Sequence, residues 1–483
     1  MRRLILVAAA LLLASCGLYK KYEAPSFDGV KSAEEVKVVG WREMFTDPLL
    51  QGLIETALAN NVDMQAALLR VDQAHAALAA SRAAYWPSLS ANAGAGVPGT
   101  PLDGSPSGYL TLGARADWQL DIFGSRLNAS RSSAAALAQR EAYAQAVRAD
   151  IIASVAEYYY SLASLDEQLR ISEEALLTWD STIKVLSSLK AAGKTNEVAV
   201  LQAEARRLKI EASVVSLRKS INDTETALRL LLGVAEANST VVSPSGPPAT
   251  EPGAPGNSPI SGVNTRVIRP SGGDLSAAIP RDSLGSAIFP EEFINSIQLG
   301  TVAMRPDVKQ AEAALAAAWY DANAARAALY PTLSLSGTLG WTSTNGTISD
   351  PSSWIWNALA SLTQPIINGR AARSKSQVAK DEAEIAKLQY RQALLRAGAD
   401  VNKALVACQA ARERITLGEQ QQEALRQTVE RIELLMRYST TTYLEVLTAQ
   451  QSFLDAELSL VADKAALASA SIALFRAVGG GAN

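Results

Sequence analysis

The sequence predicts a mainly α-helical protein that is internally duplicated and supplies β-strands to a membrane barrel. Three observations predict this class: long helical segments with heptad spacing, two segments in which apolar and polar residues alternate, and a repeat that relates the two halves of the chain. Alternation with a period of two is typical of a strand with one apolar and one polar face. Heptad spacing is typical of helices that wind around neighbouring helices.

The repeat is visible in short matching segments at a constant offset. NVDMQAAL at Asn61 matches RPDVKQAEAAL at Arg305, RAAYWPSLS at Arg82 matches RAALYPTLS at Arg326, and DIFGSR at Asp121 matches PIINGR at Pro365. The first repeat is therefore expected at 41–234, with a β-hairpin at 87–121, and the second at 296–483, with a β-hairpin at 331–365. Residues 235–295, which contain the Pro/Gly/Ser-rich run SPSGPPATEPGAPGNSP from Ser243, are expected to form a linker and an equatorial segment.

The N-terminus has the features of a secretory signal. Residues 1–15, MRRLILVAAALLLAS, combine a positive start with an apolar run that is too short for a stable membrane anchor. The segment LASC at 13–16 resembles the bacterial lipobox, so Cys16 is expected to be lipidated. Residues 16–40 would then be a tether attached to the lipid. The alternative is an ordinary cleavage site beside a chance cysteine. After Cys16 there is no run of 18 or more apolar residues, so a membrane crossing would have to be made of strands.

Each repeat also contains a long helix and a shorter return helix. Apolar residues of the first repeat step by four and three from Ile151 to Leu186. A helix from Ser125 to Lys190 would be about 100 Å long at 1.5 Å per residue. Taken alone, the heptads indicate only a structural coiled coil.

The alternating segments are long enough to cross a membrane as tilted strands of about 9–11 residues. We expect these side chains of the two hairpins to face lipid: Leu89, Leu110, Leu112, Trp118, Leu333, Leu335, Trp341, Trp354 and Trp356. A sheet in lipid has no open edge, and four strands are too few to close a barrel, so the chain would have to assemble with copies of itself. A soluble sheet with one face on a core is the alternative.

Composition and charge exclude several other functions. The net charge of −3 and the pI near 5.6 argue against a nucleic-acid partner. His75 is the only histidine in the sequence, and metal-ligand spacing is absent. No enzyme activity and no cofactor are predicted.

Taken together, the lipobox, the duplicated order of helices and hairpins, and the segments WPSLS, YPTLS, DIFG, MRPDV and TYLEVLTAQ resemble the TolC-type outer-membrane efflux proteins, especially their OprM-like (NodT-type) lipoprotein branch. The resemblance implies a homotrimer in the outer membrane, whose twelve strands close one barrel in lipid and whose helices continue it as a periplasmic α-barrel. It also implies a passive efflux duct for small molecules such as drugs and toxic compounds. The implied partners are a periplasmic adaptor (membrane fusion) protein and an inner-membrane pump of RND type. Two alternatives stay open: a protein-secretion duct of the same fold, and a structural coiled-coil lipoprotein.

The far ends of the long helices are the candidate periplasmic tip and gate. The breaks KAAGKTNEVAV and RYSTTTYLEVL are the segments suited to a helix reversal. The candidate residues are Lys190, Gly193, Lys194 and Glu197 in the first repeat, and Glu433, Arg437, Tyr438, Thr441 and Glu445 in the second. The resemblance implies closure by polar contacts between helices and often by an acidic ring, but threonines occupy 440–442 here, which puts an acidic ring in doubt. The alternative is that these residues are ordinary solvated charges at helix ends.

Overall fold

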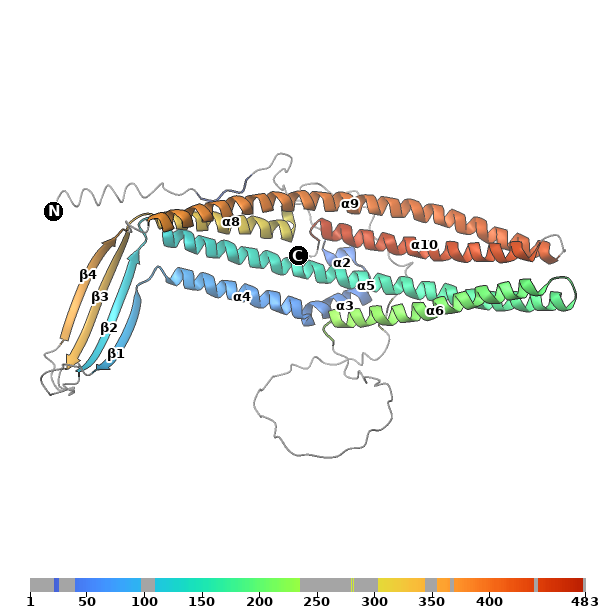
Figure 1. Cartoon of the computed structure of the whole chain (residues 1–483), viewed down its shortest axis with the longest axis horizontal. Helices are drawn as coiled ribbons and strands as arrows, with labels where there is room; N and C mark the ends of the chain where they lie inside the picture. The colour runs from blue at the N-terminus through green and yellow to red at the C-terminus, as the bar shows by residue number, and fades with distance from the viewer. Residues whose placement is uncertain are drawn as a thin grey trace, which may run out of the picture.

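The computed structural model is an elongated molecule with a four-stranded sheet at one end and long helices that run away from it (Figure 1). It describes residues 21–25, 40–96, 109–234, 279, 281, 303–343, 354–364, 369–437 and 442–480. The expected signal peptide, Cys16 and most of the tether lie outside these residues, as does nearly all of the 235–295 linker.

The two repeats share one order of elements. The first contains the short α2 (Trp41–Met44) and α3 (Pro48–Asn60), followed by α4 (Val62–Ala83), β1 (Ser88–Gly96), β2 (Tyr109–Leu120), α5 (Ser125–Ala191) and α6 (Glu197–Leu231). The second contains α8 (Pro306–Ala327), β3 (Thr332–Ser343), β4 (Trp354–Thr363), α9 (Gly369–Arg437) and α10 (Tyr443–Ala477). The duplicated, mainly helical fold class with two β-hairpins, expected from the sequence, is confirmed.

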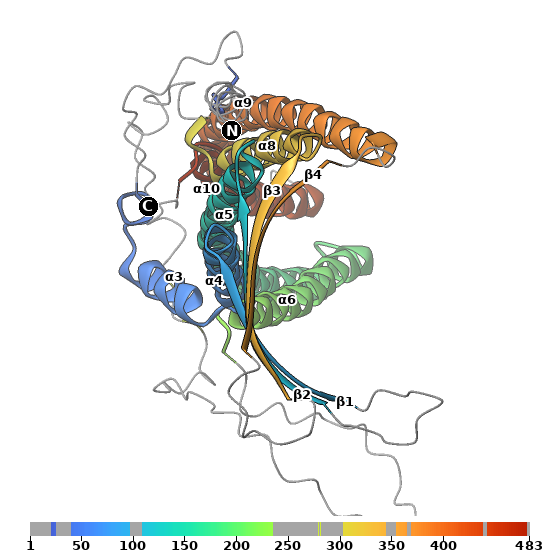
Figure 2. The same ribbon diagram turned by 90° about the vertical axis from the view of Figure 1, so that its left-hand side faces the viewer.

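The helices form one curved row. Near the sheet the order across the row is α4, α5, α8 and α9, and in the distal half it is α6, α5, α10 and α9. The helices α5 and α9 run the full length of the row, whereas α4 with α6, and α8 with α10, are half-length pairs that meet end to end (Figure 1). Viewed along the long axis, the helices follow an arc and α3 lies on its convex side (Figure 2).

The start of α5 shows how a local sequence signal fixes the passage from strand to helix. Gly124 precedes the helix with a φ of 72°, a conformation that glycine adopts without steric cost. The carboxylate of Asp121 accepts hydrogen bonds from the backbone N–H groups of Arg126 (3.0 Å) and Leu127 (2.7 Å), which have no partner within the helix. The DIFGSR segment thus ends strand β2 and caps the long helix.

A core of fully buried residues lies halfway along the row, where α2 and α3 cover the convex face. Trp41, Leu50 and Ile54 are fully buried there, and the ring of Phe45 meets the ring of Phe475 of α10 at a centroid distance of 5.4 Å. Asp47 caps α3 by accepting from the backbone N–H of Leu49 at 2.8 Å. This core joins the first repeat to the end of the second.

Among the helices that the structure describes, one, α10, is long and apolar enough to cross a membrane by length and composition, with a mean hydropathy of 1.5 over its most apolar window. Half of that window is buried within the chain, because α10 packs against α9 and α5. Its apolar character is therefore accounted for by the core of the helix row.

Candidate functional site: the strand layer and the distal helix turns

The four strands form one antiparallel sheet in the order β1, β2, β3, β4. The register pairs Leu112 with Ala93 and Trp341, and it pairs Trp341 with Trp354, so apolar residues stand opposite apolar residues on every strand. A one-residue slip would move all of them to the other face, so this agreement between four strands fixes the register. The sheet therefore has one mainly apolar face. The opposite face is polar on β1, β2 and β3, whereas β4 adds the apolar Ile355 and Leu359 to it.

All nine side chains expected to face lipid lie on this apolar face, by strand alternation and register. Five of these side chains are exposed, and Leu89 is 79% exposed: Leu89, Leu112, Trp118, Trp354 and Trp356. Trp341 differs, because only 8% of it is exposed, and it stands in register between Leu112 and Trp354. Large apolar side chains exposed on both edge strands, such as Leu89 and Trp356, form the kind of patch that a soluble monomer rarely shows.

Aromatic side chains gather near the helix-side end of the sheet. Trp118 donates its indole N–H to the carbonyl of Tyr85 at 2.9 Å, which ties β2 to the segment between α4 and β1. The ring of Phe123 stacks on the ring of Tyr330, with centroids 4.9 Å apart. Aromatic side chains with a polar edge suit the boundary between lipid and water.

The distal turn between α5 and α6 contains the four first-repeat candidates. Gly193 has a φ of 71°, its N–H donates to the carbonyl of Lys190, and the N–H of Lys194 donates to the carbonyl of Leu189, both at 2.9 Å. These two bonds form a Schellman motif, which ends α5 by satisfying its last carbonyls. The side chains of Lys190 and Glu197 form an exposed ion pair across the turn. The turn is therefore closed by glycine geometry and one surface ion pair.

The second distal turn, between α9 and α10, is described only in part. Tyr438 and Thr441 lie outside the described residues, and so does the side chain of Arg437. Glu445 lies in the first turn of α10, and Glu433 lies one turn before the end of α9.

Glu433 belongs to a polar bridge that sequence reasoning did not find. The amide of Gln450, which is buried on α10, donates to the carboxylate of Glu433 at 3.3 Å, and its oxygen accepts from the hydroxyl of Thr182 on α5 at 3.3 Å. Gln450 thus connects three helices near the distal end. A glutamine on the otherwise apolar stripe between Leu447 and Leu454 is the signal that could have identified it.

Arg206 forms a second link between the repeats at the same end. Its guanidinium donates to the carbonyl of Leu447 on α10 at 2.7 Å and lies over the ring of Trp179 on α5, 5.9 Å from the ring centroid. Arginine in this position combines a charge-assisted hydrogen bond with a contact to an aromatic face. The α5–α6 pair is therefore attached to the α9–α10 pair by both polar links.

The end-to-end junctions of the half-length helices are equivalent in the two repeats. Asn61, which precedes α4, accepts from the backbone N–H groups of Asp63 (2.9 Å) and Met64 (3.2 Å), and donates to the carbonyl of Leu231 at the end of α6 (2.9 Å). One side chain thus caps the start of one helix and satisfies the end of the other.

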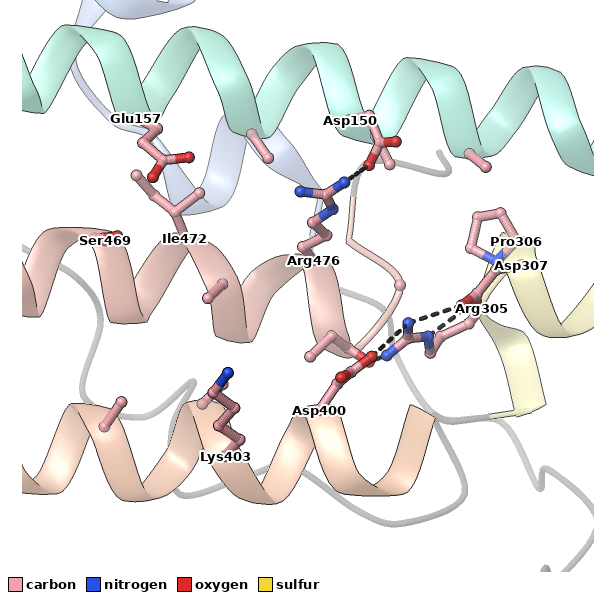
Figure 3. Close-up of a pocket in the computed structure, with 18 residues that line it drawn as sticks. Asp150, Glu157, Arg305, Pro306, Asp307, Asp400, Lys403, Ser469, Ile472 and Arg476 are labelled. Atoms are coloured by element: carbon pink, nitrogen blue, oxygen red, sulfur yellow. Dashed lines mark hydrogen bonds and ion pairs between the residues drawn. The ribbon is translucent and has the colours of Figure 1, made fainter. Parts of the chain in front are cut away.

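Arg305 takes the same place before α8, in a more charged setting (Figure 3). It donates to the carbonyl of Ala477 at 3.1 Å, to Asp307 at 2.8 and 2.9 Å, and to Asp400 of α9 at 3.2 Å. The junction borders a recess of about 550 Å³ between α5, α9 and α10, into which the ion pair of Arg476 and Asp150 also projects. Arg305, which is buried, is thus paired with two carboxylates that are about half exposed.

Within the described part of the chain, no group of three or more His, Cys, Asp or Glu residues is placed to hold a metal ion. Cys408 is buried on α9, and burial raises the pKa of its thiol.

Comparisons with known proteins assign the chain to a family. Residues 53–234 and 301–480, one segment in each repeat, match the family described as outer membrane efflux protein. The cation efflux system protein CusC of Escherichia coli (strain K12) is 26% identical over 495 residues, which cover 99% of this chain and 99% of CusC. The pyoverdine export outer membrane protein OpmQ of Pseudomonas aeruginosa is 27% identical over 509 residues, which cover 100% of this chain and 97% of OpmQ.

The fold also matches solved channel structures. The open state of the Neisseria gonorrhoeae MtrE outer membrane channel superposes with a TM-score of 0.78 at 23% identity, covering 96% of this chain and 98% of MtrE. At this identity the match concerns the fold, and the family assignment rests on the two matched segments. The chain belongs to the outer membrane efflux protein family.

Proposed function

We propose that three copies of this chain close a passive outer-membrane channel, which serves as the exit duct of a tripartite efflux system. The observation that carries the proposal is the sheet, whose strands are 9–12 residues long and share one apolar face. Its two edge strands, β1 and β4, have no partner strand on their outer sides within the described residues. In lipid each unpaired backbone group costs several kcal/mol, so β4 of one copy has to pair with β1 of the next.

The helices support the same mode of assembly. The helices α6, in the distal half, and α9, along the whole row, are outermost, and each carries an apolar stripe that no other described helix covers. On α6, Leu201, Leu208 and Val215 are exposed at seven-residue intervals. On α9, Val378, Ile385, Leu388 and Leu395 are exposed in the half near the sheet, and Leu417 and Leu434 are exposed in the distal half. Heptad stripes of this kind pack against another helix. Contact between α9 of one copy and α4 or α6 of the next would extend the row of helices into a closed tube.

The cargo is proposed to be small solutes, because the relatives are named for cation, antibiotic and pyoverdine export. This favours efflux over the alternative of a protein-secretion duct. A structural lipoprotein is disfavoured because a tether has no use for four amphipathic strands of membrane length. The periplasmic adaptor and the RND-type inner-membrane pump are proposed on the family relationship, with the distal turns as the end that meets the adaptor.

The gate is proposed to lie at these distal turns. Lys190, Gly193, Lys194 and Glu197 surround one turn, and Glu433, Arg437, Tyr438, Thr441 and Glu445 surround the other. The bridge from Thr182 through Gln450 to Glu433 supports this location, since it attaches the two helix pairs to each other beside the turns.

Single-channel conductance of the reconstituted full-length protein tests the proposal. Arg437→Ala, Tyr438→Phe, Glu445→Ala and Gln450→Ala are compared with the parent, with Thr428→Ala on the exposed surface of α9 as the control. Larger or more frequently open currents in at least one of the four, but not in the control, are expected. Closed behaviour in all four would place the constriction elsewhere. A protein that is monomeric in detergent and forms no channels would contradict the proposed function itself.

A further inference from the structure

Among the described residues of the four strands, Arg115 and Asp117 are the only charged side chains. Both belong to β2, and because they are two residues apart they share its polar face. On β1, on β3 and on Thr111–Gln119 of β2, the remainder of that face consists of Ser, Thr, Asn, Gln and Gly, and on β4 it also includes the uncharged Ile355 and Leu359. A single site of charge therefore interrupts a wall that is otherwise neutral.

The two charges are paired with each other. The guanidinium Nε of Arg115 donates to one carboxylate oxygen of Asp117 at 2.6 Å, and its Nη2 donates to the other at 2.9 Å. Two parallel bonds of this kind fix both the distance and the relative orientation of the groups. The side chains remain open to the surroundings, at 56% and 39% exposure. Each charge is therefore cancelled by its partner at the surface of the wall.

The neighbouring strands leave this pair uncovered. Ser90 of β1 and Thr338 of β3 stand opposite Arg115, while Ser88 and Ser336 stand opposite Asp117. These side chains are small and uncharged, and the hydroxyls of Ser88 and Ser90 donate to the β2 backbone. They offer neither steric cover nor a competing charge.

The level of the pair along the sheet follows from the register. Asp117 is paired with Ser88, the first residue of β1, and Arg115 lies five residues before the end of β2 at Leu120. At about 3.3 Å per residue, the pair lies within roughly 10–17 Å of the helix-side end of the sheet. A solute that leaves the helical tube would meet it on entering the barrel.

We infer that Arg115 and Asp117 form a charge-compensated ring that sets the ion selectivity of the β-barrel. The inference rests on the proposed closure of three copies with the polar face toward water. Rings of unpaired charge in a pore attract counter-ions and exclude ions of like charge, and walls of low dielectric focus this effect. Compensation within each chain removes the net charge at this level, so the barrel accepts solutes of either sign. Loss of one partner converts the same ring into a charge filter.

The test is the reversal potential of the reconstituted full-length channel in a KCl gradient. Arg115→Gln leaves three unpaired aspartates and is expected to raise the ratio of K⁺ to Cl⁻ permeability by about threefold or more, since a potential of order 1 kT changes the local ion concentration by that factor. Asp117→Asn leaves three unpaired arginines and is expected to change the ratio in the opposite direction. The exchanged pair, Arg115→Asp with Asp117→Arg, restores neutrality and is the matched control, with selectivity close to the parent.

A second measurement adds the charge after assembly and therefore avoids any effect on folding. In Ser90→Cys the new thiol stands opposite Arg115 on the polar face, while Cys408 is fully buried. Negatively and positively charged thiol reagents are expected to shift the selectivity of this variant in opposite directions. If the channels conduct but neither single substitution changes the ratio of K⁺ to Cl⁻ permeability, or neither reagent does, the inference is overturned while the proposed channel stands. Absence of any conductance in the parent and in all four gate variants would overturn the proposed channel and the inference with it.

Discussion

Asn61 and Arg305 hold equivalent positions in the two repeats, and each donates a hydrogen bond to a carbonyl at the end of the neighbouring half-length helix. Asn61 donates to Leu231 at 2.9 Å, and Arg305 donates to Ala477 at 3.1 Å. Both helix ends also carry a glycine with positive φ, Gly233 at 68° and Gly479 at 79°. The duplication therefore extends to the hydrogen bonds that join the helices, although an amide in one repeat is replaced by a guanidinium in the other.

Arg305→Ala is expected to lower the free energy of unfolding by about 1–3 kcal/mol, because it leaves the carbonyl of Ala477 without its buried donor. The carboxylates of Asp307 and Asp400 are about half exposed, so water compensates much of their loss. Thermal unfolding of the detergent-solubilised protein, followed by circular dichroism, measures this. Arg42→Ala is the control, because Arg42 and Glu55 form a highly exposed ion pair whose loss costs at most about 1 kcal/mol. Equal losses in the two variants would contradict the role of Arg305.

Gly233→Ala is expected to be more destabilising than Gly193→Ala. Both glycines have positive φ, which costs an alanine about 1 kcal/mol or more. A Cβ at residue 233 would also lie 2.6 Å from the carbonyl oxygen of Asn60, whereas a Cβ at residue 193 would meet nothing within 4 Å. Gly52→Ala, in the interior of α3 with open space around it, should instead be stabilising by up to about 1 kcal/mol. Melting temperatures of the three variants check this order.

Leu112→Arg and Leu335→Arg are expected to hinder assembly, because arginine on the lipid face of a barrel strand costs about 2–4 kcal/mol near the middle of the bilayer. Ser90→Arg and Ser334→Arg place the same charge on the polar face and should be tolerated. The fraction of protein recovered as a trimer from outer membranes is the measurement. Similar recovery of all four variants would show that the two faces have been assigned the wrong way round.

Glu457→Gln is expected to stabilise the protein at neutral pH. Burial raises the pKa of the Glu457 carboxyl, although Gln422 of α9 and Arg170 of α5 lower it; Glu174 and Glu167 add to the increase. A raised pKa means that the folded state holds the proton to higher pH than the unfolded state, so ionisation lowers stability as the pH rises above about 4.3. The gain in melting temperature should therefore be present at pH 7 and vanish near pH 4. Glu204→Gln, on an exposed position of α6, is the matched control for the change from a carboxylate to an amide.

Cys16 is expected to be the acylated first residue of the mature protein. The basis is the LASC segment at the end of the apolar N-terminal run, followed by Gly17. Mass spectrometry of the N-terminal peptide from isolated outer membranes should find a lipid-modified Cys16. A mature chain that begins at another residue would contradict this expectation.

The sequence by itself determined the strand layer and the length of the first long helix. Strict alternation assigned Leu112 and Arg115 to opposite faces, because side-chain direction in a strand depends on position parity alone. The long helix expected to begin at Ser125 does begin there, and the reversal expected around Gly193 is present, because Asp121, Gly124 and Gly193 are local signals. The repeat predicted that the second half would follow the same order.

Only the tertiary structure decided which helices meet and which polar groups they share. A heptad stripe shows that a helix packs against something, but it does not name the partner, so the bridge from Thr182 through Gln450 to Glu433 joins residues up to 268 positions apart without a sequence signal for the pairing. The meeting of Arg305 with Ala477 and Asp400 depends in the same way on the end-to-end placement of α8 and α10. Local propensity acts within a few residues, whereas these contacts depend on how whole helices are aligned by burial of their apolar stripes.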